Sequence, residues 1–275
     1  MAGENKNNFH LLVTSYHEDK QMELIKVTRE NLESEHICCA IADNKDCQVR
    51  SKKVWLEARF NEGLVFLKGN VRGKCFIEYI PAEYAWAPIN ANHYLYINCL
   101  WVSGQFKGYG YSNLLLDACI TDAKSQGKQG LVILSSKKKR GFLADPAYLT
   151  YKGFIMADTA NPDFILMYLP LVQHTVKPQF KSHIKNENAP AAQSEFSLYY
   201  TNQCPFTAKY VPLLEQIAND HGIDFHTIHI HTTEQAQHAP SPFTTFSLFY
   251  NGKFITHEIL SEKKFLKLLQ AKKLL

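Results

Sequence analysis

Apolar side chains in the first two thirds of the chain form short runs that alternate with segments of helical spacing. The run Tyr94–Val102 is apolar or aromatic at nearly every position, which is typical of a central strand covered on both faces. Beyond Gly108 and Gly110, apolar residues recur at helical spacing and predict a helix, namely at Leu115, Ala118, Cys119 and Ala123. Further strands are expected at Glu23–Val27, Leu64–Lys68, Lys74–Ile80 and Leu131–Leu134, with two more between Ile155 and Leu169.

Two helices are expected beside these strands. Thr28 suits the N-cap of a helix that follows the first strand, and a short helix is expected around Tyr148. Strands that alternate with helices in this way predict an α/β (α+β) fold.

The pattern changes between residues 173 and 194. This segment contains Pro178, Pro190 and the polar run Lys185–Asn188, and it has too few apolar residues to fold by itself. We expect a first domain over residues 1–172, a linker over residues 173–194 and a second domain over residues 195–275. Each of the two domains is long enough for its own core.

The last eighty or so residues again alternate between strands and helices. Strands are expected at Phe196–Tyr200, Phe225–Ile230 and Phe246–Tyr250, and Asn251-Gly252 predicts a tight turn into a fourth strand at residues 253–255. Pro205 suits the first position of a helix that begins just after Cys204. A final helix is expected over residues 260–275.

The composition of the 275 residues is that of a folded chain, with 45% apolar, 12% aromatic and 20% charged side chains. No apolar run approaches the ~20 residues of a membrane-spanning helix, and residues 1–10 lack the apolar core of a signal peptide. The net charge of +4 is scattered, which does not indicate a nucleic-acid-binding protein. The 7 cysteines are an odd number, mostly within apolar segments, and predict reduced thiols in a cytoplasmic protein.

The segment from Leu100 to Ser112 carries the clearest chemical signal, because it joins the central strand to the helix through glycines. Glycine allows a close backbone approach to an anion, and free N–H groups at a helix start point at a phosphate. A tight turn without any ligand explains these residues equally well. The dinucleotide-binding spacing is incomplete because Asn113 stands at its third glycine, and no P-loop lysine motif is present.

Lys107-Gly108-Tyr109-Gly110-Tyr111-Ser112 resembles the Arg/Gln-Gly-x-Gly-x-Gly/Ala loop of the GNAT superfamily of N-acetyltransferases. A second register, Gln105 to Gly110, fits a looser form of that motif. The run from Tyr148 to Phe154 resembles the late helix and Gly-Phe turn of the same family, and the expected strand order agrees. The stretch from Gly73 to Phe154, followed by a cysteine-containing appendage, resembles the YoaP-like subgroup.

This resemblance implies a GNAT-type mixed central sheet flanked by helices and acetyl-CoA (coenzyme A) as the cofactor. It also implies direct attack of a substrate amine on the acetyl thioester beside a splayed central strand. A main-chain N–H near Val102 would stabilise the carbonyl oxygen. The coenzyme-binding residues that the resemblance implies are Leu100, Trp101, Val102, Lys107, Gly108, Tyr109, Gly110, Tyr111 and Ser112.

Candidate catalytic residues are fewer than the family pattern leads one to expect. Many members carry a tyrosine four residues before the glycine of the Gly-Phe turn, as the acid for the departing thiolate, but this chain has Leu149 there. We therefore take the neighbouring Tyr148 as the candidate acid. Glu78 is the candidate base, because a carboxylate within an apolar strand is unusual unless it has a specific role. Alternatively, Glu78 forms a salt bridge or faces solvent, and Tyr148 is part of the core. Proximity of the two substrates alone can supply much of the catalysis.

The second domain resembles the thioredoxin/glutaredoxin fold, so the whole would be a GNAT domain with a small thioredoxin-like C-terminal domain. Cys204 at a helix start is the candidate redox thiol, because that position lowers a thiol pKa. Thr207 replaces the second cysteine, which excludes dithiol exchange, and Pro242 lies two residues before the expected cis-proline position at Thr244. A single-thiol role and a non-redox docking role both remain open. His229 and His231 lack further ligands nearby, so no metal is expected.

Together these features predict an acetyl-CoA-dependent N-acetyltransferase acting on a small-molecule or peptide amine. The alternative is a non-catalytic acyl-CoA-binding module whose C-terminal domain docks a partner or acts as a monothiol redox centre. Tyr84, Trp86 and the stretch Pro88–Asn92 are candidate acceptor-cleft residues. The basic run Lys137–Arg140 suits either coenzyme phosphates or solvent. No membrane or nucleic-acid partner is expected, and assembly of identical chains stays open.

Overall fold

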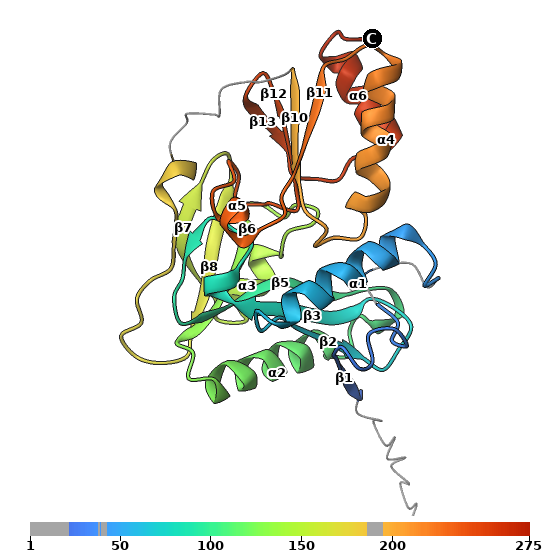
Figure 1. Ribbon diagram of the computed structural model, residues 1–275. Helices are drawn as coiled ribbons and strands as arrows, with labels where there is room; N and C mark the ends of the chain where they lie inside the picture. The colour runs from blue at the N-terminus through green and yellow to red at the C-terminus, as the bar shows by residue number, and fades with distance from the viewer. Residues whose placement is uncertain (1–21, 38, 40–42, 186–194) are drawn as a thin grey trace, which may run out of the picture.

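The computed structural model describes residues 22–37, 39, 43–185 and 195–275, which form two α/β units that lie against each other (Figure 1). In the first unit, seven strands form one sheet in the order β1-β2-β3-β5-β6-β8-β7. The strands are β1 (Leu24–Val27), β2 (Val65–Gly69), β3 (Cys75–Pro81), β5 (Tyr94–Val102), β6 (Gly130–Ser136), β7 (Ile155–Ala160) and β8 (Phe164–Pro170). All seven strands expected from the apolar runs of this part are confirmed.

The sheet is mixed, because β5 and β6 run parallel whereas the other neighbouring strands run antiparallel. Helix α1 (Cys47–Phe60) packs on one face through Trp55 and Leu56. Helices α2 (Tyr111–Ser125) and α3 (Pro146–Tyr151) pack on the opposite face. Figure 1 shows α1 and the second unit on one side of the sheet and α2 on the other.

The expectation of a helix directly after Thr28 is wrong. Residues 29–34 form turns, and the helix begins only at Cys47, where the Asp46 side chain accepts a hydrogen bond from the Gln48 N–H at 2.8 Å. The buried face of α1 includes Gln48, Lys52 and Lys53. Polar residues on the inner face remove the apolar periodicity on which the prediction of a helix depends.

The second unit contains a four-stranded sheet in the order β11-β10-β12-β13. Its strands are β10 (Phe196–Tyr200), β11 (Phe225–His229), β12 (Phe246–Tyr250) and β13 (Lys253–Thr256), and its helices are α4 (Thr207–Asp220), α5 (Thr233–Gln237) and α6 (Glu262–Ala271). Strands β10 and β11 are parallel, and β12 is antiparallel to both β10 and β13. Asn251 and Gly252 have φ values of 47° and 71°, as the predicted tight turn requires.

One expectation for this unit is wrong. Helix α4 begins at Thr207, so Pro205 precedes the helix instead of opening it. Among the described residues the only cis peptide bond joins Asn161 to Pro162, so Pro242 does not supply a cis-proline.

Part of the predicted linker is folded against the first unit. Strand β9 (Gln179–Phe180) pairs with β4 (Ile89–Asn90), and a short helical turn, η3, spans Ser182–Ile184. The side chains of Phe180 and Ile184 are buried. The rest of the linker prediction, residues 186–194, lies outside the described residues.

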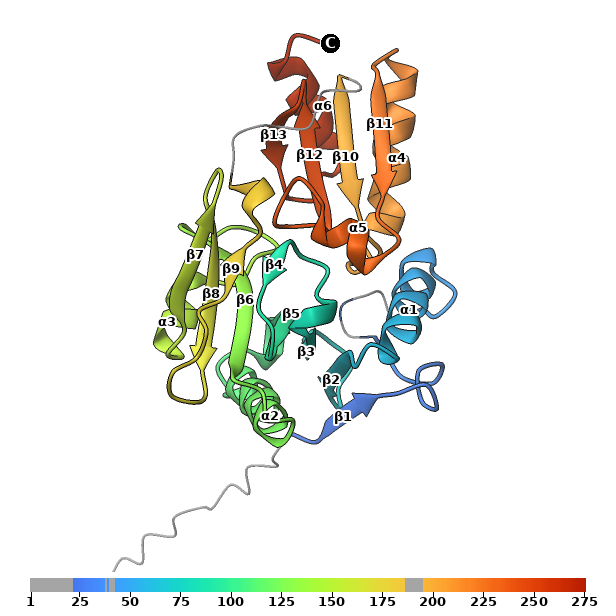
Figure 2. The ribbon, with the colours of Figure 1, turned by 60° about the vertical axis from the view of Figure 1, so that its left-hand side comes forward.

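One hydrophobic cluster spans the two units, and the second unit also has a core of its own. Ile230, Ala236 and Ala239 of the second unit belong to the same buried cluster as residues of α1, β3 and β5. Hydrogen bonds cross the boundary from Gln237 Nε2 to Glu83 O at 3.1 Å and between His257 Nε2 and Gly141 O at 3.0 Å. Figure 2 shows the second unit seated on the edge formed by β4, β5 and α1. None of the helices in the described ranges is long and apolar enough to cross a bilayer.

Candidate active site

The central sheet opens between strands β5 and β6. Residues Tyr94–Ile97 pair with Gly130–Ile133, but β5 continues to Val102 without β6 as a neighbour, because β6 follows β8 to Ser136. A β-bulge marks the point of separation, where Glu78 pairs with Cys99 and Tyr79 pairs with Ile97. The extra residue, Asn98, is the one that a bulge redirects. The result is a gap in the sheet, where, among the described residues, β5 has no strand partner on the β6 side beyond Ile97 and β6 carries only an isolated bridge from Ser135 to Ala144 on its β5 side.

Two main-chain donors of β5 face this gap. Ser103 donates its N–H to Lys74 O at 2.9 Å, so this N–H points toward the β3 side. Successive N–H groups of a strand point to opposite sides, so those of Leu100 and Val102 point away from β3, toward the gap. These two residues and Trp101 are three of the predicted coenzyme-binding residues.

The predicted glycine loop lies at the start of α2, on the α2 face of the sheet. Gly108 and Gly110 have φ values of 88° and 77°, and a Cβ atom at either position would meet nothing within 4 Å. The N–H groups of residues 108–112 donate to no acceptor among the described residues, whereas the next two residues, 113 and 114, both donate to Gly110 O. Lys107 and Tyr109 are exposed. The loop is therefore an open set of free donors at a helix N-terminus, which suits a phosphate group.

A cavity of about 420 Å³ lies on the opposite, α1 face, at the gap and beneath the second unit. Residues of β5 and β6 line it, including Ile97, Trp101 and Leu134. The second unit contributes residues 203–205 and 242–245. Residues on both sides of the gap line the cavity, so the cavity lies at the gap.

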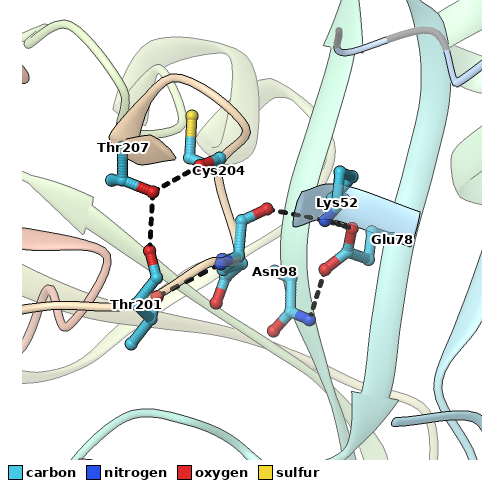
Figure 3. Close-up of polar contacts among 7 residues, drawn as sticks. Lys52, Glu78, Asn98, Thr201, Cys204 and Thr207 are labelled. Carbon is cyan, nitrogen blue, oxygen red and sulfur yellow. Dashed lines mark hydrogen bonds and ion pairs between the residues drawn. The ribbon is translucent and has the colours of Figure 1, made fainter. Parts of the chain in front are cut away.

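Glu78 lies in the wall of this cavity and is held by two partners (Figure 3). One carboxylate oxygen forms an ion pair with Lys52 Nζ, and the other accepts a hydrogen bond from Asn98 Nδ2 at 2.9 Å. The Lys52 and Glu78 side chains are only 2% and 1% exposed. Burial by itself would lower the pKa of Lys52, but the Glu78 carboxylate outweighs it, so the pKa is raised and Lys52 stays charged.

Tyr148, the predicted acid, lies on α3 with its hydroxyl group buried and without a hydrogen-bond partner among the described residues. Burial raises its pKa, and the nearby Ser112 side chain at the start of α2 offsets part of this increase. Tyr148 is therefore a neutral hydroxyl donor next to the glycine loop. Leu149, at the position that carries tyrosine in many family members, is 1% exposed and packs in the core.

Three thiols line the cavity, those of Cys39, Cys99 and Cys204. Burial raises the pKa of Cys204 to about 11 and that of Cys99 to about 12. The helix-start effect expected for Cys204 is therefore outweighed by burial. Thr207, in the place of a second cysteine, is fully buried, and its hydroxyl group lies within hydrogen-bond distance of two main-chain oxygens, Thr201 O at 2.8 Å and Cys204 O at 2.7 Å (Figure 3). Its role is to hold the loop.

Other predicted residues lie away from the cavity. Of the candidate acceptor-cleft residues, only Trp86 lines the cavity. Tyr84 is 48% exposed, and Ile89 is packed in the core. In the basic run, Lys139 pairs with Asp145 at 2.8 Å and Arg140 with Asp163 at 2.7 Å. Within the described ranges no group of three or more His, Cys, Asp or Glu residues could hold a metal ion, and His229 stacks on Tyr200.

Sequence reasoning missed Lys52, Asn98 and the wall from the second unit. The residues around Lys52 in the sequence do not show that it is buried, since a lysine in a helix is ordinarily a surface residue. Asn98 was visible as a polar interruption of the apolar strand. The wall residues meet the cavity only through the contact between the two units, which no local pattern encodes.

Known proteins that are similar to this chain include a relative in sequence and several solved structures. A protein of Bacillus subtilis (strain 168) described as an uncharacterized N-acetyltransferase, YoaP, is 44% identical over 246 residues, which is 89% of this chain and 97% of the relative. The YoaP-like family profile matches residues 224–267. The crystal structure of the Escherichia coli GNAT-family N-acetyltransferase YhbS with CoA is 10% identical, and the alignment covers 61% of this chain and 93% of that chain with a TM-score of 0.40. The structure of yncA of Salmonella typhimurium with acetyl-CoA is 15% identical, and the alignment covers 57% of this chain and 97% of that chain with a TM-score of 0.39. On the strength of the full-length relative, the chain belongs to the YoaP family of N-acetyltransferases.

Proposed function

We propose that the protein is an acetyl-CoA-dependent N-acetyltransferase that moves the acetyl group to an amine by direct attack. The observation that carries the proposal is the gap between β5 and β6. It has free main-chain donors at the start of α2 on one side of the sheet and a cavity of about 420 Å³ on the other. An acyl donor and an amine can therefore approach each other through the sheet from opposite faces.

The residues of the glycine loop fit the diphosphate of coenzyme A. The open space at Gly108 and Gly110 admits a phosphate close to the backbone, and the free N–H groups of residues 108–112 would donate to it. Lys107 adds a positive charge beside the loop. Leu100, Trp101 and Val102 would hold the pantetheine arm along the unpaired edge of β5.

Acetyl-CoA supplies an activated acetyl thioester, and the chain supplies the groups around it. The Val102 N–H, which points into the gap, would donate to the thioester carbonyl oxygen as negative charge develops there. Glu78 would accept the proton of the amine, since its carboxylate lies in the cavity wall on the acceptor side. Lys52 and Asn98 orient that carboxylate. Tyr148, neutral and buried next to the loop, would donate its proton to the leaving thiolate.

We further propose that the second unit is a thioredoxin-like domain without redox function. Its parallel β10–β11 pair followed by the antiparallel β12–β13 hairpin supports the fold. The raised pKa of Cys204 and the structural role of Thr207 speak for a docking domain rather than a thiol-redox centre. The domain boundaries at residues 172 and 195 and a cytoplasmic location are part of the proposal.

Calorimetry with acetyl-CoA and mass spectrometry of an amine panel test the function together. We expect saturable binding of acetyl-CoA and acetylation of at least one amine. Absence of binding at millimolar coenzyme would refute the proposal, whereas binding without turnover of any amine would favour a sensing module.

A further inference from the structure

We propose that the C-terminal unit forms a permanent wall of the acceptor pocket, and that the acceptor is a compact primary amine with an apolar body and no second charge. The inference rests on the proposed function and names the class of its acceptor. It excludes polyamines, aminoglycosides and lysine side chains of proteins as preferred acceptors.

The wall consists of two loops of the second unit. One loop carries Gln203, Cys204 and Pro205, and the other carries Pro242 and Phe243. Across the cavity they face the strands and loops of the first unit that border the gap. An acceptor amine that reaches the gap from the α1 face therefore has to lie against residues of the C-terminal unit.

Several contacts hold this wall in place. Lys52 Nζ donates to Gln203 O at 2.7 Å, and Thr244 donates its hydroxyl group to Trp86 O. Phe243 packs edge-on against His257, which in turn contacts Gly141 O of the first unit at 3.0 Å. Together with the shared core, these contacts make the pocket a fixed feature. A pocket of about 420 Å³ between two packed units suits a small molecule rather than a side chain of a folded protein.

The charges of the pocket favour an acceptor with one amine group. Among the described lining residues only Lys52 and Glu78 are charged, and they form an ion pair with each other. A polyamine or aminoglycoside would bring additional positive charges next to the Lys52 ammonium, with no carboxylate left to pair with them. An unpaired charge taken out of water is strongly unfavourable.

The rest of the pocket is lined largely by apolar side chains and neutral thiols. Trp86, Trp101, Leu134 and Phe243 line it, and the thiols of Cys99 and Cys204 are neutral at pH 7 because burial raises the pKa of both. These side chains bind aliphatic or aromatic groups through burial of apolar surface. Arylalkylamines combine such a body with a single primary amine.

The test compares kcat/KM of the full-length protein for five amines: 2-phenylethylamine, tryptamine, spermidine, kanamycin and a lysine-containing peptide. We expect the two arylalkylamines to exceed the other three by at least about tenfold. Acetyl-CoA binding is measured separately by calorimetry. Normal coenzyme binding with preference for spermidine, kanamycin or the peptide would overturn the inference alone, whereas loss of coenzyme binding would overturn the proposed function.

Variants of Phe243 test the wall directly. Phe243→Ala is expected to raise KM for 2-phenylethylamine about tenfold and to leave the KM for acetyl-CoA unchanged. Phe243→Trp, which narrows the pocket and keeps an apolar ring, is expected to penalise tryptamine more than 2-phenylethylamine. The matched control is Tyr210→Ala, a half-buried aromatic residue of the same unit outside the cavity, which should change neither KM. Folded Phe243 variants with an unchanged acceptor profile would refute the role of the second unit.

Discussion

Lys52 on α1 of the first unit donates to the main-chain oxygen of Gln203, the residue before Cys204, at 2.7 Å. The same ammonium group forms the buried ion pair with Glu78 in the cavity wall. One lysine therefore connects the helix, the candidate base and the loop of the C-terminal unit (Figure 3). The position of the second unit and the orientation of the Glu78 carboxylate depend on the same side chain.

Substitution of this lysine should be costly for stability. Lys52→Met leaves the Glu78 carboxylate buried without its counter-charge, so we expect the free energy of unfolding to fall by about 3–5 kcal/mol. Chemical denaturation measures the change. Lys264→Ala removes an exposed pair, Lys264–Glu258 at 3.4 Å, and should cost no more than about 1 kcal/mol. The double variant Lys52→Met/Glu78→Leu should recover much of the loss; equal losses for the exposed and the buried pair would contradict the prediction.

Glu78→Gln separates a catalytic from a structural role. The amide keeps the size of the side chain, but its single oxygen can accept from only one of Lys52 and Asn98, and it cannot take a proton. If Glu78 is the base, kcat should fall by roughly 100-fold or more with little change in the KM for acetyl-CoA. An unchanged kcat would assign Glu78 to structure and leave proximity as the source of catalysis.

Strands of both sheets can be predicted from the sequence because their burial is recorded locally, as in Tyr94–Val102, where nearly every side chain is apolar. The glycine loop can be predicted for the same reason, since its chemistry lies within six consecutive residues. Helix α1 cannot, because Gln48, Lys52 and Lys53 occupy its inner face, and the two lysines are stabilised by the distant partners Glu78 and Glu33. The acceptor wall at residues 203–205 and 242–245 depends on the docking of the two units. Contacts between the two units join residues far apart in the sequence, so no local pattern predicts them.

Glycine substitutions should separate coenzyme binding from backbone strain. Gly110→Ala places a Cβ at a φ of 77°, which costs about 1–2 kcal/mol, and also directs it into the open side of the loop. We expect the Kd for acetyl-CoA, measured by calorimetry, to rise at least about tenfold. Gly127→Ala is the matched control, because Gly127 has a φ of 64°, is equally open and lies at the far end of α2. It should lose similar stability and bind acetyl-CoA normally; equal effects on binding would argue against the loop as the coenzyme site.

Thiol reactivity tests the redox alternative. With its pKa near 11, Cys204 holds far less thiolate at pH 7 than an ordinary cysteine, so iodoacetamide should alkylate it about a hundredfold more slowly than the exposed Cys47. Peptide mass spectrometry of the native protein measures both rates, and the denatured protein should label at all cysteines. Faster labelling of Cys204 than of Cys47 would revive the monothiol redox role.

Stability at alkaline pH should reveal the same thiol. The pKa of Cys204 is about 11 in the folded protein and about 8.5 in an unfolded chain. Between these values the folded state binds more protons than the unfolded state, so the free energy of unfolding falls as pH rises. The contribution of Cys204 is fully present below about pH 8.5 and is lost progressively toward pH 11, at up to roughly 1.4 kcal/mol per pH unit. In urea denaturation, the free energy of unfolding of Cys204→Ala should therefore decline less steeply at alkaline pH than that of the parent protein. Cys47→Ala should decline like the parent. Parallel pH profiles for all three proteins would mean that Cys204 titrates normally in the folded state.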